Sequence, residues 1–199
     1  MEYLTTDELK KLLTAARQKS DRDWLLILVS FWHGLRASEA IALQVSNVRD
    51  GYLVVARLKG SLRTVQQLME HADNLLDEKK GLTSWIAAKP ANARLFPITR
   101  QHFGRIMRTH CATAGIPSHR SNPHVLKHTC AHYVIRAGIQ VAQQHLGHKS
   151  LSSTGAYLRI TDATASAAVQ ALAREWQASR QQLKDERATG TRGEPTLLV

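Results

Sequence analysis

Apolar residues near the start of the chain recur three and four positions apart, which is the spacing of one face of an α-helix. This face lies within Leu9–Ala16, and Thr5 followed by Glu8 has the pattern of a helix N-terminal capping box. Residues 21–33 are apolar on nearly every side, and Gly34 follows them. The pattern predicts an amphipathic first helix and a second, buried helix that ends at Gly34.

The hydrophobic pattern then changes to one that is typical of β-structure. Asp50-Gly51 is a turn signal between two apolar segments, and residues 58–61 form the tip of a second predicted hairpin. Strands are expected at 45–48, 52–56 and 62–68. Together they predict a small three-stranded antiparallel sheet near residues 46–68.

Beyond residue 70 the spacing is again helical, with Gly and Pro residues at the boundaries. Helices are predicted at 72–88, 100–114, 123–137, 141–146, 151–157 and 161–182. Residues 185–199 are charged and then interrupted by Gly and Pro, which predicts a disordered tail. We therefore expect one mixed α/β domain over residues 1–184, mostly α-helical with a small three-stranded antiparallel sheet.

Composition narrows the class of protein. The chain has 199 residues, of which 43% are hydrophobic, and it contains no tract of about 18 consecutive apolar residues. No signal peptide pattern opens the sequence, and two cysteines provide no disulfide framework. We expect a globular cytoplasmic protein without a membrane partner.

The net charge of +11 predicts a polyanionic partner, and nucleic acid is the usual one. From charge alone a basic but unspecialised protein remains an open alternative, and an anionic membrane surface is a weaker one. Candidate DNA contacts are Arg57, Arg63, Arg100, Arg105, Arg108, His110 and Lys149. For each of these residues singly, a solvated surface position is the competing interpretation.

The stretch 122–157 contains the candidate chemistry. His124 and Lys127 lie one helical turn apart, so both side chains can point the same way. Leu146-Gly147-His148 has the pattern of a helix end, and Tyr157 follows His148 by nine residues. A tyrosine near imidazoles and cations suggests nucleophilic attack on an anion, because the cations stabilise the developing charge.

These motifs together resemble the catalytic domain of the tyrosine recombinase, or phage integrase, family. The resemblance rests on His-x-x-Lys-His from His124, on Leu-Gly-His and on Tyr157, and it covers roughly residues 3–176. Further back, the segment from Gly34 to Glu39, Gly-Leu-Arg-Ala-Ser-Glu, is similar to the first arginine motif of that family. Here Arg36 follows the buried helix, and Ser38 is predicted to cap a short helix.

The resemblance implies a site-specific recombinase that cleaves and rejoins DNA through a 3′-phosphotyrosyl intermediate, without a metal or other cofactor. Tyr157 would be the nucleophile, and Arg36 and Lys127 would neutralise the phosphate. His124 would help to remove the tyrosine proton, His148 would bind the phosphate, and Lys59 at the hairpin tip would protonate the leaving oxygen. Glu39 and His128 would support the site.

The same resemblance implies double-stranded DNA, a tetrameric synapse of protomers and accessory DNA-bending proteins as partners, at the nucleoid of the cytoplasm. Members of the family usually carry an N-terminal helical domain that clamps the other face of the DNA. This sequence begins almost at the first catalytic-domain helix, so no such core-binding domain is expected within it.

One position departs from the family pattern. The family usually has arginine where this chain has Lys127, and lysine lacks the planar fork that binds a phosphate through two hydrogen bonds. The alternative function is therefore a recombinase-derived DNA-binding protein with weak or no strand exchange. A relaxing topoisomerase is less favoured, and so is a metal-binding regulator that uses His124, His128 and His132.

Overall fold

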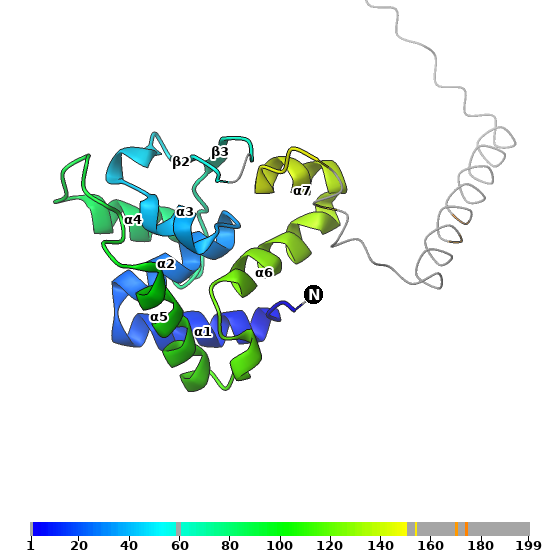
Figure 1. Ribbon diagram of the computed structural model, residues 1–199, viewed down its shortest axis with the longest axis horizontal. Helices are drawn as coiled ribbons and strands as arrows, with labels where there is room; N and C mark the ends of the chain where they lie inside the picture. Colours follow the sequence, from blue (N-terminus) through cyan, green and yellow to red (C-terminus); the bar gives the residue numbers. More distant parts are fainter. Residues whose placement is uncertain (1, 59–60, 151–153, 155–169, 171–173, 175–199) are drawn as a thin grey trace, which may run out of the picture. The chain divides into compact units, whose positions relative to one another are not determined.

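The computed structural model describes residues 2–58, 61–150, 154, 170 and 174 (Figure 1). The chain divides into two compact units, Met1–Leu158 and Arg159–Val199, and the fold below is that of the first. The predicted helices at 151–157 and 161–182 and the predicted tail at 185–199 lie outside the described residues. No helix within the described ranges is long and apolar enough to cross a membrane.

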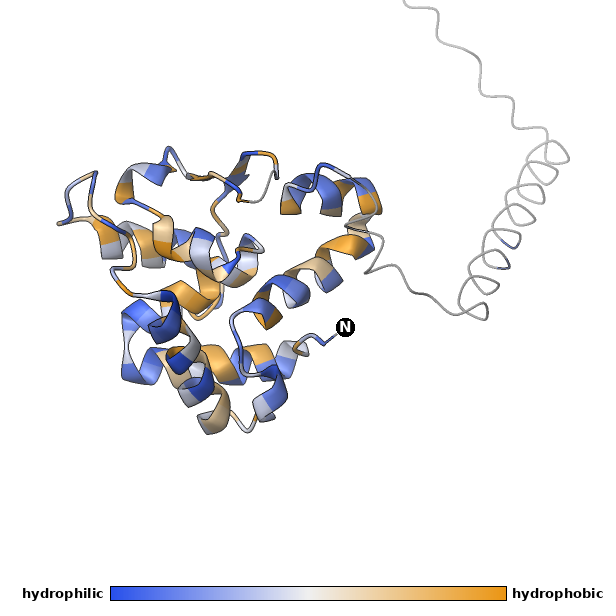
Figure 2. Ribbon diagram, viewed as in Figure 1, coloured by the Kyte–Doolittle hydropathy of each residue, from blue (hydrophilic) through white to orange (hydrophobic). Residues whose placement is uncertain are grey.

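Helix α2 (Asp21–Trp32) lies at the centre of the helical packing. It packs against α1 (Thr6–Lys19), α3 (Ala37–Ala42), α4 (Glu78–Ile86) and α6 (His124–Val134) (Figure 1). Its residues from Asp23 to Phe31 are all buried, and it stands out as a hydrophobic helix in Figure 2. The predicted capping box at the start of α1 is confirmed, with Thr5 and Glu8 satisfying each other's backbone N–H groups.

The small sheet has the predicted antiparallel topology, in the order β1-β2-β3. Its strands are β1 (Val48–Arg49), β2 (Tyr52–Val55) and β3 (Thr64–Gln67). Leu53 and Val55 point into the core, and Thr64 and Gln66 of β3 are buried beside them. The segment before β1 differs from the prediction, because it forms a 3₁₀ turn, η1 (Val45–Asn47), with only the last residue of the expected strand paired.

The predicted helix at 72–88 is wrong in its first part, since α4 begins only at Glu78. Two tryptophans of α2, buried Trp24 and half-buried Trp32, explain the difference. Trp24 donates its indole N–H to the carbonyl oxygen of Leu75, and Trp32 donates to that of Leu76. These tertiary hydrogen bonds use carbonyl groups that a helix would need for itself, and Asp77 then caps α4.

The remaining helices fall close to the predicted ranges. They are α5 (Arg100–Thr113), the 3₁₀ turn η2 (Ser118–Arg120), α6, the 3₁₀ turn η3 (Ile135–Ala137) and α7 (Ile139–Leu146). Helix α7 packs against both α6 and β3, and α3 packs against α5. The mixed, mostly helical fold class is confirmed, and this packing brings the turn after α2, the hairpin and the end of α7 together.

Candidate active site

The turn after α2 positions Arg36. Gly34 has a φ of +56°, and a Cβ atom there would lie 2.6 Å from Cδ2 of Leu146, so a side chain at this position would collide with α7. Arg36 itself is the N-cap residue of α3, and not Ser38 as the sequence predicted. The prediction failed because the Glu39 carboxylate reaches back and accepts the backbone N–H of Arg36 at 2.9 Å.

The carboxylate of Glu39 is the shared acceptor of the site. Its side chain is 0% exposed and accepts from Nη1 of Arg36 at 2.8 Å, from Nη1 of Arg57 at 3.3 Å and from the N–H of Leu58 at 3.1 Å. Burial alone would raise the pKa of Glu39, but these donors hold it below the ordinary value. Glu39 therefore stays ionised at neutral pH and holds the Arg36 guanidinium in place.

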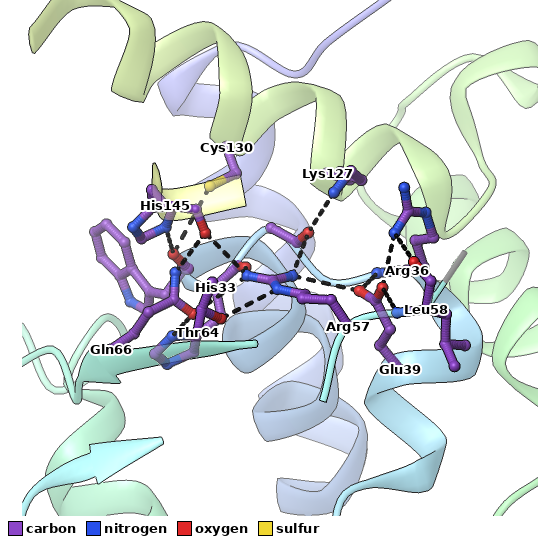
Figure 3. A network of polar contacts seen from close by, with 12 residues as sticks. His33, Arg36, Glu39, Arg57, Leu58, Thr64, Gln66, Lys127, Cys130 and His145 are labelled. Carbon is purple, nitrogen blue, oxygen red and sulfur yellow. Dashed lines mark hydrogen bonds and ion pairs between the residues drawn. The ribbon is translucent and has the colours of Figure 1, made fainter. Parts of the chain in front are cut away.

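Arg57 lies inside the protein, with a side chain that is 0% exposed. It donates hydrogen bonds to the carbonyl oxygens of His33 at 2.8 Å, Gly34 at 3.2 Å and His145 at 3.0 Å (Figure 3). Its other contacts are Glu39, Thr64 and Gln66. This placement contradicts the expectation that Arg57 contacts DNA, because its guanidinium is directed away from solvent and bonded to the protein.

Lys127 projects from α6 towards the same turn. The residue is 3% exposed, and its Nζ donates to the carbonyl oxygen of Gly34 at 3.1 Å (Figure 3). Burial lowers the pKa of Lys127 to about 8, and the nearby charges of Arg57 and Arg36 act in the same direction. The lysine is thus still mostly protonated at neutral pH, but its ammonium group is held in a place that disfavours a cation.

His124 lies at the start of α6, beside a groove of about 630 Å³. The groove is lined by Arg36, Ser38, Arg100, Gln101, Asn122 and His124, among others. Partial burial, followed by the charges of Lys127 and Arg36, lowers the pKa of His124. An open groove that carries two arginines suits an anionic ligand, and the largely neutral imidazole beside it can act as a base.

His148 follows the left-handed residue Gly147, which ends α7. Its Nδ1 lies 2.9 Å from Oγ1 of Thr154, and the residue is 7% exposed. Burial lowers the pKa of His148 to about 4, and Lys127 and Arg36 add to the effect. The ring is therefore neutral at pH 7, and the hydroxyl of Thr154, which sequence reasoning missed, sets its orientation.

The turn at Gly147 is also where the hairpin meets α7. The N–H of Leu62 donates to the carbonyl oxygen of Gly147 at 2.9 Å. A Cβ atom on Gly147 would lie 2.6 Å from the carbonyl oxygen of Leu62 and 3.0 Å from Cγ of Arg57, and its φ is +67°. The Leu-Gly-His motif therefore requires glycine for two reasons: its left-handed backbone ends α7, and the hairpin packs too closely against it for a side chain.

The other predicted site residues fall into three groups. Lys59 and Tyr157 lie outside the described residues. The exposed cations are Arg63, Arg100, Arg105, Arg108 and Lys149, so their predicted DNA contacts stay predictions. His110 is instead buried, with Nε2 3.1 Å from Oδ2 of Asp23, which contradicts its expected contact with a phosphate.

The histidine ladder of α6 does not form a metal site in the part of the chain that the structure describes, where no cluster of three metal-ligating side chains occurs. The rings of His124 and His128 meet edge to face, with centroids 4.3 Å apart. His132 instead stacks on Tyr3 at 3.6 Å. Burial lowers the pKa of His128 to about 4, with His124 and Lys127 contributing, so this ring also stays neutral.

The charges of the site do not balance. Arg36 and Arg57 form ion pairs with the carboxylate of Glu39, and a third cation, Lys127, shares the Gly34 carbonyl with Arg57. The described residues thus leave about two positive charges in excess at neutral pH, partly removed from water. Such an excess of positive charge can stabilise the extra negative charge of a phosphoryl transition state.

Comparison with known proteins identifies relatives of this chain. The sequence model of the phage integrase family matches residues 2–164. The tyrosine recombinase XerA of Pyrococcus furiosus is 31% identical over 166 residues, which cover 79% of this chain and 57% of that protein. The type 1 fimbriae regulatory protein FimB of Escherichia coli K12 is 28% identical over 169 residues, covering 76% of this chain and 81% of FimB.

The fold is likewise found among solved structures. The crystal structure of a λ integrase dimer bound to a COC′ core site superposes with a TM-score of 0.63. The two chains are 21% identical, and the superposition covers 76% of this chain and 59% of that one. At this level of identity the likeness establishes the fold.

Proposed function

This chain belongs to the phage integrase family, and we propose that it is a site-specific recombinase that cleaves and rejoins DNA through Tyr157. The observation that carries the proposal is a cluster of three cations, Arg36 and Arg57 paired with the buried carboxylate of Glu39 and Lys127 at the Gly34 carbonyl. That cluster lies beside a groove that carries His124, and neutral His148 is held near it. Because Arg36 is already oriented by Glu39 at the groove without a ligand, little reorganisation of this cation is needed when a phosphate binds.

In the proposed reaction, the phenolic oxygen of Tyr157 attacks the scissile phosphorus atom, and the bond to the 5′ oxygen of the next nucleotide breaks. The tyrosine proton passes to His124, whose lowered pKa keeps it in the basic form. A proton from Lys59 neutralises the departing oxygen, which leaves as a 5′-hydroxyl. Attack by the hydroxyl of another strand reverses these steps, so the phosphodiester is conserved and no nucleotide cofactor is consumed.

Arg36 and Lys127 have the role of charge stabilisers in this scheme. The Arg36 guanidinium is oriented by Glu39 and lines the groove, so its remaining donors face the phosphate oxygens. His148 donates to the phosphate from the ring nitrogen that does not meet Thr154. The exposed arginines of α5, together with Arg63 and Lys149, contact phosphates along the flanking duplex.

The partners belong to the same proposal. The chain spans only 57% of the length of the XerA relative. The activity of a whole recombinase is therefore part of the proposal. The λ integrase of the comparison is a dimer on DNA. We infer that this protein also binds double-stranded DNA at the nucleoid and acts with further copies of itself, helped by DNA-bending proteins.

Covalent trapping tests the function directly. The protein is incubated with nicked DNA substrates that carry the sequences flanking its own locus, and a denaturation-resistant protein–DNA adduct is measured, with Tyr157→Phe as control. We expect an adduct with the wild-type chain and none with the Phe variant. Tight DNA binding without any adduct would instead support the binding-only relative.

The same assay with Lys127→Arg then tests the departure at this position. If a forked donor is what the site lacks, the arginine variant forms the adduct faster than the wild-type protein. If the lysine suffices in this environment, the arginine variant gains nothing or loses activity, because the larger side chain must fit a buried space beside Arg57.

A further inference from the structure

Arg57 connects three segments that carry residues of the proposed site. Its own segment leads from β2 to Lys59, two residues further on. Its Nη1 and Nη2 atoms donate to the carbonyl oxygens of Gly34 and His33, in the turn that leads to Arg36. Nη2 also donates to the carbonyl oxygen of His145, three residues before His148 (Figure 3). A side chain with five donors is suited to this task, since it can bond several carbonyl groups at once.

The carbonyl oxygen of Gly34 has two donors. Nη1 of Arg57 approaches it at 3.2 Å, and Nζ of Lys127 approaches it at 3.1 Å (Figure 3). A carbonyl oxygen has two lone pairs and can accept both bonds. The two donors are cations of like charge, so each makes the other's position less favourable.

Lys127 is bonded to the Gly34 carbonyl and is not among the residues that line the groove. To neutralise a phosphate in the groove, its ammonium group has to leave the Gly34 carbonyl. Without a second donor this movement would leave a buried carbonyl group unpaired, which is costly. With Arg57 in place the carbonyl keeps one hydrogen bond, and the repulsion between the two cations is reduced when Lys127 reaches an anion.

We propose that Arg57 is a positioning residue of the strand-cleavage site: it keeps the Gly34 carbonyl hydrogen-bonded while Lys127 moves from that carbonyl to the DNA phosphate. The inference rests on the proposed function and deepens it. It also accounts for a lysine at position 127, because the shorter side chain leaves the guanidinium of Arg57 room at the same carbonyl, where a second guanidinium would compete for it.

The charge of Arg57 affects the pKa of Lys127, so a titration of Lys127 can detect the contact between the two side chains. Burial is the largest cause of the lowered pKa of Lys127, and Arg57 is the next. The other charged or titratable groups that act on Lys127 or are acted on by it are Arg36, Glu39, His124, His128, Cys130, His145 and His148. Removing the charge of Arg57 alone should therefore raise the pKa of Lys127.

The experiment compares Arg57→Met, which removes both charge and donors, with Arg57→Lys, which keeps the charge but loses the fork. Arg49→Met is the matched control, since Arg49 is an exposed arginine of the same sheet. The rate of adduct formation is measured at saturating nicked substrate from pH 6 to pH 10. For Arg57→Met we expect a loss of about tenfold or more at neutral pH and an alkaline limit that moves up by about half a pH unit or more.

Arg57→Lys is expected to slow cleavage while leaving the alkaline limit where the wild-type protein has it, because the charge beside Lys127 is retained. A purely structural role would instead lower activity in all variants in proportion to the folded fraction, with no change of the pH profile. That result, or a profile of Arg57→Met equal to that of Arg49→Met, would overturn the proposal.

A second measurement separates this inference from the proposed function. In protein labelled with ¹³C at lysine Cε, the signal that disappears in Lys127→Arg reports the titration of Lys127 without DNA. We expect its midpoint to rise in Arg57→Met and not in Arg49→Met. If the wild-type protein binds DNA but forms no adduct, the proposed function fails. An unchanged titration midpoint in Arg57→Met would instead show that Arg57 does not act on Lys127, which would overturn this inference.

Discussion

Replacement of Lys127 by methionine is expected to stabilise the protein at neutral pH while it abolishes the proposed cleavage. A fall in the pKa of a lysine from 10.5 to about 8 corresponds to a penalty of about 3 kcal/mol for keeping it charged in the folded protein. The lost hydrogen bond to Gly34 offsets about 1 kcal/mol of this. The carbonyl group is not left unpaired, because Arg57 still donates to it. The net gain at pH 7 should be about 2 kcal/mol.

The sign of the pH dependence follows from the direction of the shift. The folded-state pKa of Lys127 lies below the unfolded value, so the unfolded chain binds more protons between about pH 8 and pH 10.5. The contribution of Lys127 to the free energy of unfolding of the wild-type protein therefore rises with pH across that window. The advantage of Lys127→Met is full below pH 8 and disappears towards pH 10.5.

Urea unfolding at several pH values from 7 to 10 measures this difference. Lys11→Met serves as control, since Lys11 is an exposed lysine of α1. The difference between variant and wild type is the informative quantity, because other groups that titrate in the same range cancel in it. A Lys127→Met protein that is no more stable than the wild type at pH 7, or whose advantage stays constant to pH 10, would refute the reasoning.

Three further outcomes are expected. Glu39→Gln should destabilise the protein by about 3–5 kcal/mol in urea unfolding, because it leaves the buried guanidinium of Arg57 without its carboxylate; a loss below about 1 kcal/mol would contradict the buried pairing. Burial raises the pKa of Cys130 to about 12, so its neutral thiol contributes stability that is lost as the pH rises above 9; Cys130→Ala should flatten that loss. The hydrogen-bonded Arg120 guanidinium holds the pKa of Glu8 below its ordinary value. Glu8→Gln should therefore lower the free energy of unfolding by about 1 kcal/mol at pH 7 and leave it unchanged well below pH 4.5. A double-mutant cycle with Arg120→Met measures the coupling between the two residues.

The parts of the fold that the sequence predicted well are those determined by residues close together in the chain. The capping box of Thr5 and Glu8 depends on residues within one helical turn, and so does the predicted helix start at Arg100, where the Thr99 hydroxyl accepts the N–H of His102; both are confirmed. The helix expected from residue 72 failed for the opposite reason. The carbonyl groups of Leu75 and Leu76 are taken by tryptophans about fifty residues away in sequence, which no local pattern records.

Within the site, the positions of Arg36 and Lys127 followed from motifs, but the position of Arg57 did not. One local signal was available: Leu53 and Val55 point into the core, and the alternation of a strand places residue 57 on the same side. The residue type argued against a buried position, since arginine is rarely buried in proteins. The carbonyl groups that accept its hydrogen bonds lie up to 88 residues away, so only the assembled fold shows that a buried guanidinium is satisfied there.

The close approach of the hairpin to Gly147 sets a limit on how this protein can be re-engineered. Libraries that aim at a new DNA target can vary the exposed positions of α5, because side chains there face solvent. They cannot vary position 147, where even alanine would meet the Leu62 carbonyl and the stem of Arg57. A selection scheme that randomises the chain evenly would therefore lose its active clones at this glycine, whatever target it selects for.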